Sequence, residues 1–161
     1  HIMRQEELLR IMSKNAKIST EDMAAMLEAS EEEIQETIAR MEEEGIICGY
    51  PTLINWDCTD NEMVTALIEV NVALHRETGF DKVAERIYNY PEVNSVYLIS
   101  GSFDFMVTIE GKTLREVSQF VSDKLSPLDS VLSTKTNFIL KKYKDHGTVM
   151  AEQPKDERIE M

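Results

Sequence analysis

The chain has 161 residues, of which 42% are hydrophobic and 29% are charged, and this is enough for one ordinary domain or two small ones. Its net charge is −13, and residues 1–50 hold twelve acidic side chains against five basic ones. An acidic N-terminal third is unfavourable for a polyanion-binding surface. No apolar run reaches the roughly 18 to 20 residues that cross a bilayer, and no secretory signal is evident. Cys48 and Cys58 have the spacing of free thiols, so we expect a cytoplasmic protein.

Three short helices are predicted in the first 45 residues. The first covers about Gln5–Lys14, with its apolar residues on one face. The second begins at Ser19 and the third at Ser30, and in both an acidic residue three positions later completes a capping-box pattern. Gly45 follows the third helix, where a left-handed residue ends a helix at little cost.

The second and third of these helices form a helix-turn-helix pattern. Only Glu28 and Ala29 separate the second helix from the cap of the third, which is then the recognition helix. Residues 46–50 are predicted to be extended and to form a wing, so residues 3–50 are predicted to be a winged helix-turn-helix. Residues 51–61 are predicted to continue as a linking strand that ends in a turn.

From residue 62 the apolar period changes from 3.6 to 2, which indicates strands. The predicted order is β-α-β-β-α-β, with strands at about 63–74, 93–100, 103–109 and 132–140 and helices at about 80–87 and 114–125. This α+β arrangement is ferredoxin-like, with both helices on one face of an antiparallel sheet. The other face needs a cover, so residues 62–143 are predicted to form a homodimer. Residues 144–161 are highly charged without periodicity and are predicted to be a disordered tail.

Four stretches are similar to signatures of one protein family. Residues 14–19 (KNAKIS) resemble the segment before its second helix, and residues 41–50 (MEEEGIICGY) resemble the start of its wing. Residues 100–105 (SGSFDF) resemble its hairpin signature, and residues 134–140 resemble its final strand. Together they resemble the Lrp/AsnC family, the leucine-responsive or feast/famine regulators. The resemblance implies a DNA-binding transcription regulator that forms dimers and then octamers or larger rings, and that binds an amino acid or a similar small metabolite.

The resemblance also implies where such an effector binds. Gly101 and Asp104 would contribute to a cleft between sensing domains, with Ser100, Ser102 and Thr136 nearby. An aspartate can accept from an ammonium group, and backbone N–H groups at a turn can hold a carboxylate. The alternative is that residues 101 and 102 only form a tight hairpin that Asp104 caps.

The recognition helix departs from the basic pattern that the family usually has. Candidate contacts to double-stranded DNA are Lys17, Ser30, Gln35 and Arg40, and further contacts could come from basic residues at positions 10, 14, 141 and 142. Three consecutive glutamates, residues 31–33, occupy the helix N-terminus, where they would repel a phosphate. The alternative function is therefore an assembly or sensor subunit that does not bind DNA and forms mixed oligomers with a related regulator.

An enzymatic function is not predicted, and neither a catalytic residue nor a metal ligand is assigned. The sequence has no P-loop, no dinucleotide-binding glycine pattern and no metal-ligand spacing, so no cofactor is expected. Sirohaem decarboxylases resemble the same family, but an acidic chain with three histidines is poorly suited to a tetrapyrrole that carries several carboxylates.

Overall fold

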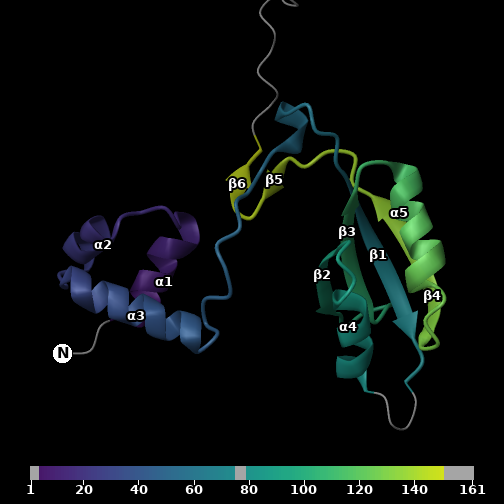
Figure 1. Cartoon of the computed structure of the whole chain (residues 1–161), viewed down its shortest axis with the longest axis horizontal. Coiled ribbons are helices and arrows are strands. Elements are labelled where there is room, and N and C mark those ends of the chain that lie inside the picture. The colour runs from purple at the N-terminus through teal and green to yellow at the C-terminus, as the bar shows by residue number, and fades with distance from the viewer. Residues whose placement is uncertain (1–3, 75–78, 151–161) are drawn as a thin grey trace, which may run out of the picture. The chain divides into compact units, whose positions relative to one another are not determined.

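The computed structural model describes residues 4–74 and 79–150, which divide into two compact units (Figure 1). The first unit ends at Leu53 and the second begins at Ile54, within the segment predicted to link two domains. In the described parts of the chain, no helix is long and apolar enough to span a membrane.

The first unit contains three helices, α1 (Gln5–Lys14), α2 (Thr20–Leu27) and α3 (Glu31–Glu43). Their apolar faces meet in a small core, as the helical spacing predicted. Its buried members are Leu8, Met23, Ala24, Leu27, Ile34 and Met41. Helices α2 and α3 are separated by a three-residue turn, which is the length found in helix-turn-helix motifs.

Both predicted serine caps are confirmed. The Ser19 hydroxyl accepts a hydrogen bond from the Asp22 N–H at 3.0 Å, and the Ser30 hydroxyl accepts one from the Glu33 N–H at 3.1 Å. Each bond satisfies an N–H group that has no partner within its helix, and such a cap contributes typically about 1 kcal/mol. The two helix starts of the helix-turn-helix are therefore fixed by the sequence itself.

The turn between α2 and α3 holds a side chain in a backbone conformation that favours glycine. Glu28 ends α2 with φ 53° and ψ 45°, in the left-handed region. Its N–H and that of Ala29 both donate to the carbonyl of Ala24, which closes the helix end. The left-handed conformation costs a residue with a Cβ about 1–2 kcal/mol relative to glycine.

Replacing Glu28 with glycine is expected to raise the free energy of unfolding of the first unit by about 0.5–1 kcal/mol, because glycine relieves this conformation but gains chain entropy on unfolding. Urea denaturation followed by helix circular dichroism measures the change. Glu28→Ala is the matched control, since it removes the charge and keeps the Cβ. Equal stabilisation by both substitutions would mean that charge, not backbone conformation, is responsible.

The wing is the part of the first unit that the sequence predicted wrongly. Residues 46–50 form no strand. The N–H groups of Ile46 and Ile47 both donate to the carbonyl of Met41, at 2.8 and 3.1 Å, and so complete the end of α3. Gly45 has φ 75°, which confirms the predicted left-handed stop. The chain therefore leaves α3 through a helix-capping turn, and residues 46–50 pair with no strand.

The predicted linking strand over residues 51–61 is also wrong. The segment holds one 3-10 turn, η1 (Trp56–Cys58), and no strand. Asn55 begins this turn, and its side-chain oxygen accepts from the Asp57 N–H at 3.2 Å. The Thr59 hydroxyl donates to the carbonyl of Trp56 at 2.7 Å. Local side-chain bonds of this kind compete with strand pairing.

The second unit has the predicted ferredoxin-like fold. Its sheet order is β2-β3-β1-β4 with every pair antiparallel. Helices α4 and α5 cover one face of the sheet (Figure 1). The elements are β1 (Val64–Val72), α4 (Phe80–Tyr88), β2 (Val93–Leu98), β3 (Phe105–Gly111), α5 (Leu114–Phe120), the π-helical turn η2 (Val121–Leu125) and β4 (Val131–Phe138).

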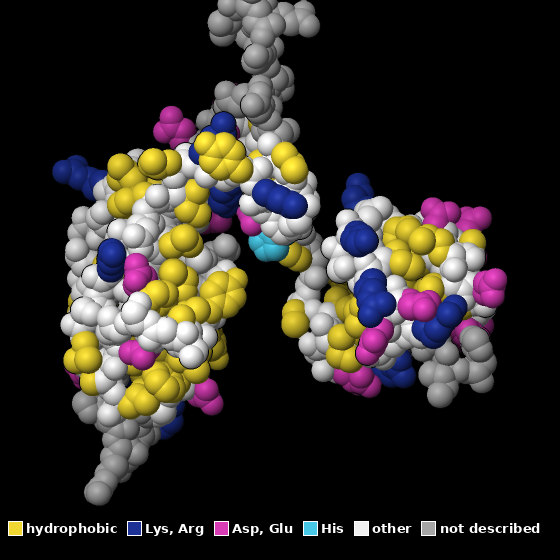
Figure 2. Space-filling model, turned by 180° about the vertical axis from the view of Figure 1, so that it is seen from behind, with side chains coloured by type: hydrophobic (Ala, Val, Ile, Leu, Met, Phe, Trp, Pro, Cys, Tyr) yellow, Lys and Arg dark blue, Asp and Glu magenta, His cyan; other side chains and the backbone are white. Residues whose placement is uncertain are grey.

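Alternation along the strands separates the two faces of the sheet. On the helix side, alternate residues of β1 and β3 are buried, among them Ile68, Val107 and Phe105. Among the described residues of the second unit, no helix or strand covers the other face. Its side chains include Leu67, which lies opposite Thr108 and Asn137 in the strand register. Figure 2 shows this face, along which hydrophobic side chains gather between polar ones.

The beginning of the predicted disordered tail is ordered. Strands β5 (Lys144–Asp145) and β6 (Thr148–Val149) form a hairpin. The two residues between them, His146 and Gly147, have φ of 47° and 80°, which is the geometry of a type I′ turn. Periodicity could not reveal strands of two residues each, whereas a turn that ends in glycine is a hairpin signal. Residues 151–161 of the predicted tail lie outside the described residues.

Candidate effector and DNA-binding sites

The loop between β2 and β3 is fastened to β1 by Asp104. Its carboxylate oxygen Oδ2 accepts from the Val72 N–H at 2.8 Å, and its own N–H donates to the carbonyl of Val70 at 3.0 Å. Its carbonyl accepts from the Ile99 N–H at 2.8 Å, which closes the loop on itself. The register of β1 against β4 shifts between Asn71 and Val72, where the Asp104 carboxylate binds. Asp104 therefore holds the loop and an irregular strand end together.

The other predicted effector residues of this loop are accessible. Ser100, Gly101 and Ser102 are all exposed. A Cβ built on Gly101 would meet only the Ile99 side chain, at an ordinary 3.6 Å. The surroundings of Gly101 therefore do not require glycine.

Thr136 is not part of this loop cluster. It lies on β4 opposite Ile68, so its side chain is on the helix-covered face. Strand β1 separates it from β3 and from the loop. The structure therefore brings together four of the five predicted effector residues, Ser100, Gly101, Ser102 and Asp104, and leaves Thr136 apart.

Two of the predicted DNA contacts are already engaged within the first unit. The Ser30 hydroxyl caps α3, and the Arg40 guanidinium donates from Nη2 to Oε1 of Gln5 in α1 at 2.9 Å. Gln35 is exposed on α3, and Lys17 is exposed in the turn before α2. Glutamates 31, 32, 36, 42 and 43 are also exposed on α3. The solvent-facing surface of this helix is therefore acidic.

Sequence analysis missed a contact between α3 and the chain that follows it. The Tyr50 hydroxyl donates to Oε2 of Glu42 at 3.0 Å. Partial removal from water, followed by this bond and the negative charge of Glu42, raises the pKa of the Tyr50 phenol. The bond ties the segment that leaves α3 back to α3 itself. No sequence periodicity marks it, since the partners are eight residues apart across a turn.

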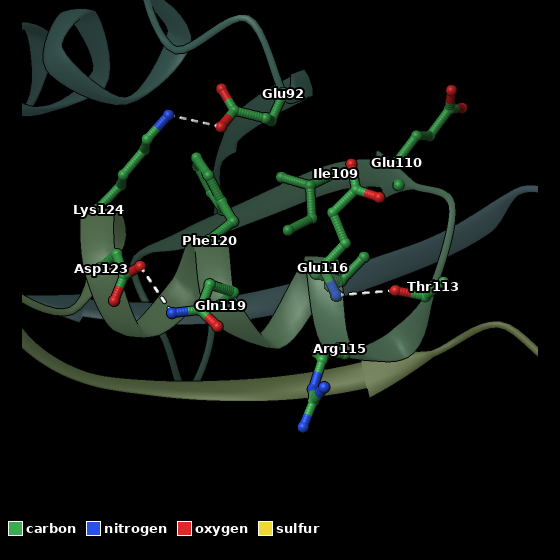
Figure 3. A pocket seen from close by; sticks show the side chains of 12 residues that line it. Glu92, Ile109, Glu110, Thr113, Arg115, Glu116, Gln119, Phe120, Asp123 and Lys124 are labelled. Carbon is green, nitrogen blue, oxygen red and sulfur yellow. Dashed lines mark hydrogen bonds and ion pairs between the residues drawn. The ribbon is translucent and has the colours of Figure 1, made fainter.

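A groove along α5 was also not predicted. It has a volume of about 360 Å³, and Figure 3 shows the side chains that line it. An ion pair between Lys124 and Glu92, with 2.7 Å between Nζ and Oε2, lies at one end. The hydrogen bond from Lys124 holds the pKa of the Glu92 carboxyl below its usual value. In the described residues, no group of three or more His, Cys, Asp or Glu side chains is placed to bind a metal ion.

Comparisons with known proteins agree with this architecture. Residues 65–149 match the Lrp/AsnC ligand binding domain. The chain is 46% identical over 157 residues to an uncharacterised HTH-type transcriptional regulator of Bacillus subtilis, YugG, and the match covers 97% of this chain and 95% of that protein.

Solved structures show the same fold. A transcriptional regulator of Neisseria meningitidis in complex with L-methionine has a TM-score of 0.71 at 18% identity, and the match covers 93% of this chain and 97% of the regulator. A feast or famine regulatory protein of M. tuberculosis, complexed with L-methionine, has a TM-score of 0.69 at 18% identity, with 86% and 90% covered. These relatives are all named as regulators. The chain belongs to the Lrp/AsnC family of transcriptional regulators.

Proposed function

We propose that this protein regulates transcription by binding DNA through its helix-turn-helix unit and by sensing an amino acid in its second unit. The observation that carries the proposal is the pairing of a capped helix-turn-helix with the Lrp/AsnC ligand binding domain in one chain. Solved neighbours in complex with L-methionine support an amino acid as the effector class.

The β2–β3 loop is the proposed effector site. The open backbone of Ser100, Gly101 and Ser102 can hold a carboxylate, while Asp104 can accept from an ammonium group. One Asp104 oxygen is already bound to Val72, so its second oxygen, Oδ1, would face the ligand. Thr136 has less support as a member of this site because it lies on the other side of β1.

A homodimer is the proposed basic assembly, and octamers or larger rings are its proposed higher forms. The support is the sheet face that α4 and α5 leave open, which carries Leu67, Met106 and the 54% exposed Tyr97. A second copy of the same face would remove these apolar side chains from water. Sedimentation velocity checks this assembly, and a monomer at micromolar concentration would contradict it.

A second function is favoured by the charge of α3. The exposed glutamates repel phosphates, and Arg40, the basic residue of α3, already binds Gln5. On this alternative, the helix-turn-helix is retained as a scaffold, and the protein joins mixed oligomers with a related DNA-binding regulator. Because acids in the first turn also stabilise a helix, α3 keeps its structure under either function.

Fluorescence anisotropy with the DNA upstream of its own gene distinguishes the two functions. Labelled DNA is titrated at low and at physiological salt, with competitor DNA, and with and without L-methionine or a mixture of amino acids. Saturable binding that survives the competitor and shifts with an amino acid supports the sensor-regulator. Absence of binding at low salt supports the scaffold alternative.

Neutralising three of the α3 carboxylates is expected to tighten DNA binding. The triple variant Glu31→Gln, Glu32→Gln and Glu36→Gln removes repulsion from a surface that would face the phosphates, and we expect an affinity gain of about tenfold at low salt. The same anisotropy titration measures it. The control, Glu85→Gln, removes a charge from the exposed side of α4 in the second unit and should leave the affinity unchanged. Equal gains would indicate an effect of net charge alone.

A further inference from the structure

The β5–β6 hairpin is a basic element in an acidic protein. Residues 141–149 hold three lysines, at positions 141, 142 and 144, against one aspartate, whereas the whole chain has a net charge of −13. Figure 2 shows basic side chains close to His146, which is cyan in that view. A positive segment on a strongly negative protein indicates a surface for an anionic partner.

This hairpin is ordered, so its charges have defined positions. Strands β5 and β6 pair over two residues each, and the Met150 N–H donates to the carbonyl of Tyr143 at 2.9 Å, just beyond the paired residues. Gly147 in the turn has φ 80°. The lysines are therefore presented by a two-stranded ribbon, which is one of the elements that proteins use to contact DNA.

Two of the three lysines of the hairpin have no carboxylate partner. Asp145 is shared by Lys142 and His146, with 3.7 Å between Oδ2 and the lysine Nζ and 3.1 Å between Oδ1 and the histidine Nδ1. Lys141 and Lys144 are exposed, and neither forms an ion pair with any described residue. Their positive charges are therefore not neutralised within the fold.

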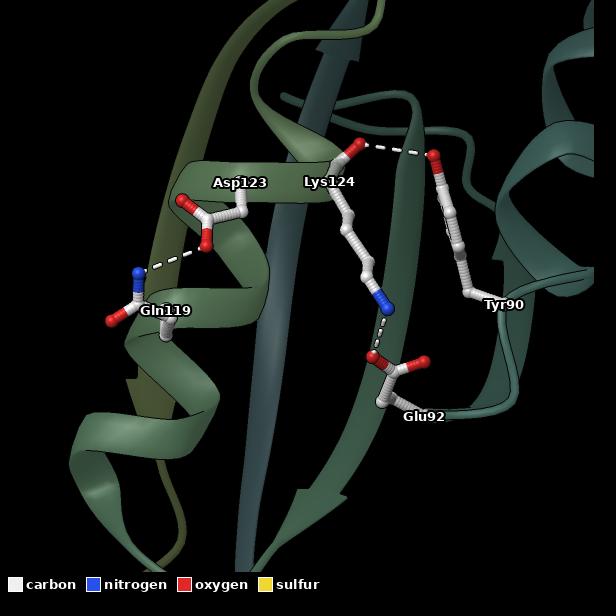
Figure 4. A network of polar contacts seen from close by, with 5 residues as sticks. All are labelled: Tyr90, Glu92, Gln119, Asp123 and Lys124. Carbon is white, nitrogen blue, oxygen red and sulfur yellow. Dashed lines mark hydrogen bonds and ion pairs between the residues drawn. The ribbon is translucent and has the colours of Figure 1, made fainter.

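The lysine at the end of α5 shows the contrast. The Lys124 ammonium group lies 2.7 Å from Oε2 of Glu92 and 5.8 Å from the ring centroid of Tyr90, so its charge is used inside the second unit (Figure 4). Lys141 instead lies 5.1 Å from the ring centroid of Tyr143, which is 74% exposed. An aromatic ring restricts a lysine side chain without cancelling its charge. The hairpin thus holds positioned cations that an anion in solution can reach.

We propose that the β5–β6 hairpin contacts the phosphate backbone of double-stranded DNA. The proposal rests on the proposed DNA-binding function, for which the hairpin supplies the positive charge that α3 lacks. The exposed surface of α3 is acidic, and Arg40 already binds Gln5. Each phosphate that a lysine neutralises releases a condensed counterion, which favours binding whatever the base sequence. Lys141 and Lys144 are the principal contacts, and Lys142 is the third.

An acidic surface of another protein chain is the competing partner for these lysines. Exposed ion pairs between two proteins contribute little, because each side chain loses freedom and water screens the charges. DNA presents closely spaced phosphates, and every contact adds a further counterion release. The unpaired lysines of the hairpin therefore favour DNA over an acidic protein surface.

The salt dependence of DNA binding tests this proposal. The triple variant Lys141→Gln, Lys142→Gln and Lys144→Gln is titrated by fluorescence anisotropy with the labelled DNA upstream of its own gene, at several salt concentrations. The slope of log affinity against log salt is expected to become shallower by about 2, and the affinity at low salt to fall at least about tenfold. A DNA of scrambled sequence should lose the same factor, because phosphates carry no sequence information. Replacing the same three lysines with arginine keeps the charge and should keep the slope.

The matched control removes the same charge elsewhere in the second unit. Lys82→Gln, Arg86→Gln and Lys112→Gln together eliminate three exposed positive charges outside the hairpin. Equal losses in both triple variants would show an effect of net charge and overturn the proposal. A wild-type slope in the hairpin variant would also overturn it and leave the proposed function standing. If the wild-type protein binds no DNA even at low salt, the proposal and the proposed function both fail.

A second measurement needs no variant. NMR titration of the full-length wild-type protein with the same DNA is expected to shift the backbone amides of residues 141–149. Shifts confined to the first unit would overturn the proposal. A thermal melt verifies that each triple variant is folded, and the wild-type shifts decide the case if the hairpin variant is not.

Discussion

Replacing Ile34 with alanine is expected to unfold the first unit and leave the second unit folded. Ile34 is fully buried in the core of the three helices, and an Ile→Ala change in a core costs about 2–5 kcal/mol. A unit of about 50 residues rarely has more than about 3–5 kcal/mol of stability, so the loss is comparable to the whole. DNA binding should disappear with it.

Calorimetry and heteronuclear NMR measure this effect. In the Ile34→Ala variant, the NMR resonances of the second unit should keep their wild-type chemical shifts. The resonances of α1, α2 and α3 should move to the chemical shifts of an unfolded chain. Ile68→Ala is the reciprocal control, because Ile68 is fully buried in the sheet core, and it should destabilise only the second unit. A single cooperative transition in which Ile34→Ala unfolds both units would contradict the independence of the two cores.

Two substitutions of Asp104 are expected to separate its structural role from its proposed role in the effector site. Asp104→Ala leaves the N–H of Val72 without its acceptor, and we expect a loss of about 1–3 kcal/mol in the stability of the second unit. Asp104→Asn keeps an acceptor oxygen for Val72, so most of the stability should remain. It removes the negative charge that would meet an ammonium group, so amino-acid affinity should still fall by about tenfold or more.

Urea denaturation and calorimetric titration with L-methionine measure the two quantities. Glu85→Gln is the matched control, since it removes one carboxylate from the exposed side of α4 in the same unit, outside the loop. If Asp104→Asn loses stability but keeps full amino-acid affinity, Asp104 only fastens the loop, and the effector site lies elsewhere.

The parts of the fold that sequence analysis predicted correctly depend on short-range physics. The caps at Ser19 and Ser30 follow from hydroxyl and N–H groups three residues apart, and the left-handed stop at Gly45 follows from a missing Cβ. The alternation of apolar and polar residues along β1 and β3 predicted which side chains are buried, because helices cover only one face of the sheet.

The incorrect predictions concern segments that would form a strand only beside a neighbouring strand. The sequence of the segment itself does not specify such a neighbour. Residues 46–61 read as extended, but a strand needs a neighbour, and local bonds such as those of Asn55 and Thr59 prevail instead. The bond between Arg40 and Gln5 joins residues 35 positions apart, and the groove at Glu92 needs three separate elements. Helix or strand periodicity contains no information on contacts of this kind.

The presence of two separate cores has an evolutionary consequence. The buried residues of the helix-turn-helix and those of the sheet form distinct clusters with no member in common. A lineage can therefore exchange surface residues of α3, from basic to acidic or back, without selection on the sensing unit opposing the change. Substitutions that alter DNA recognition and substitutions that alter effector recognition should then accumulate independently of each other within one gene.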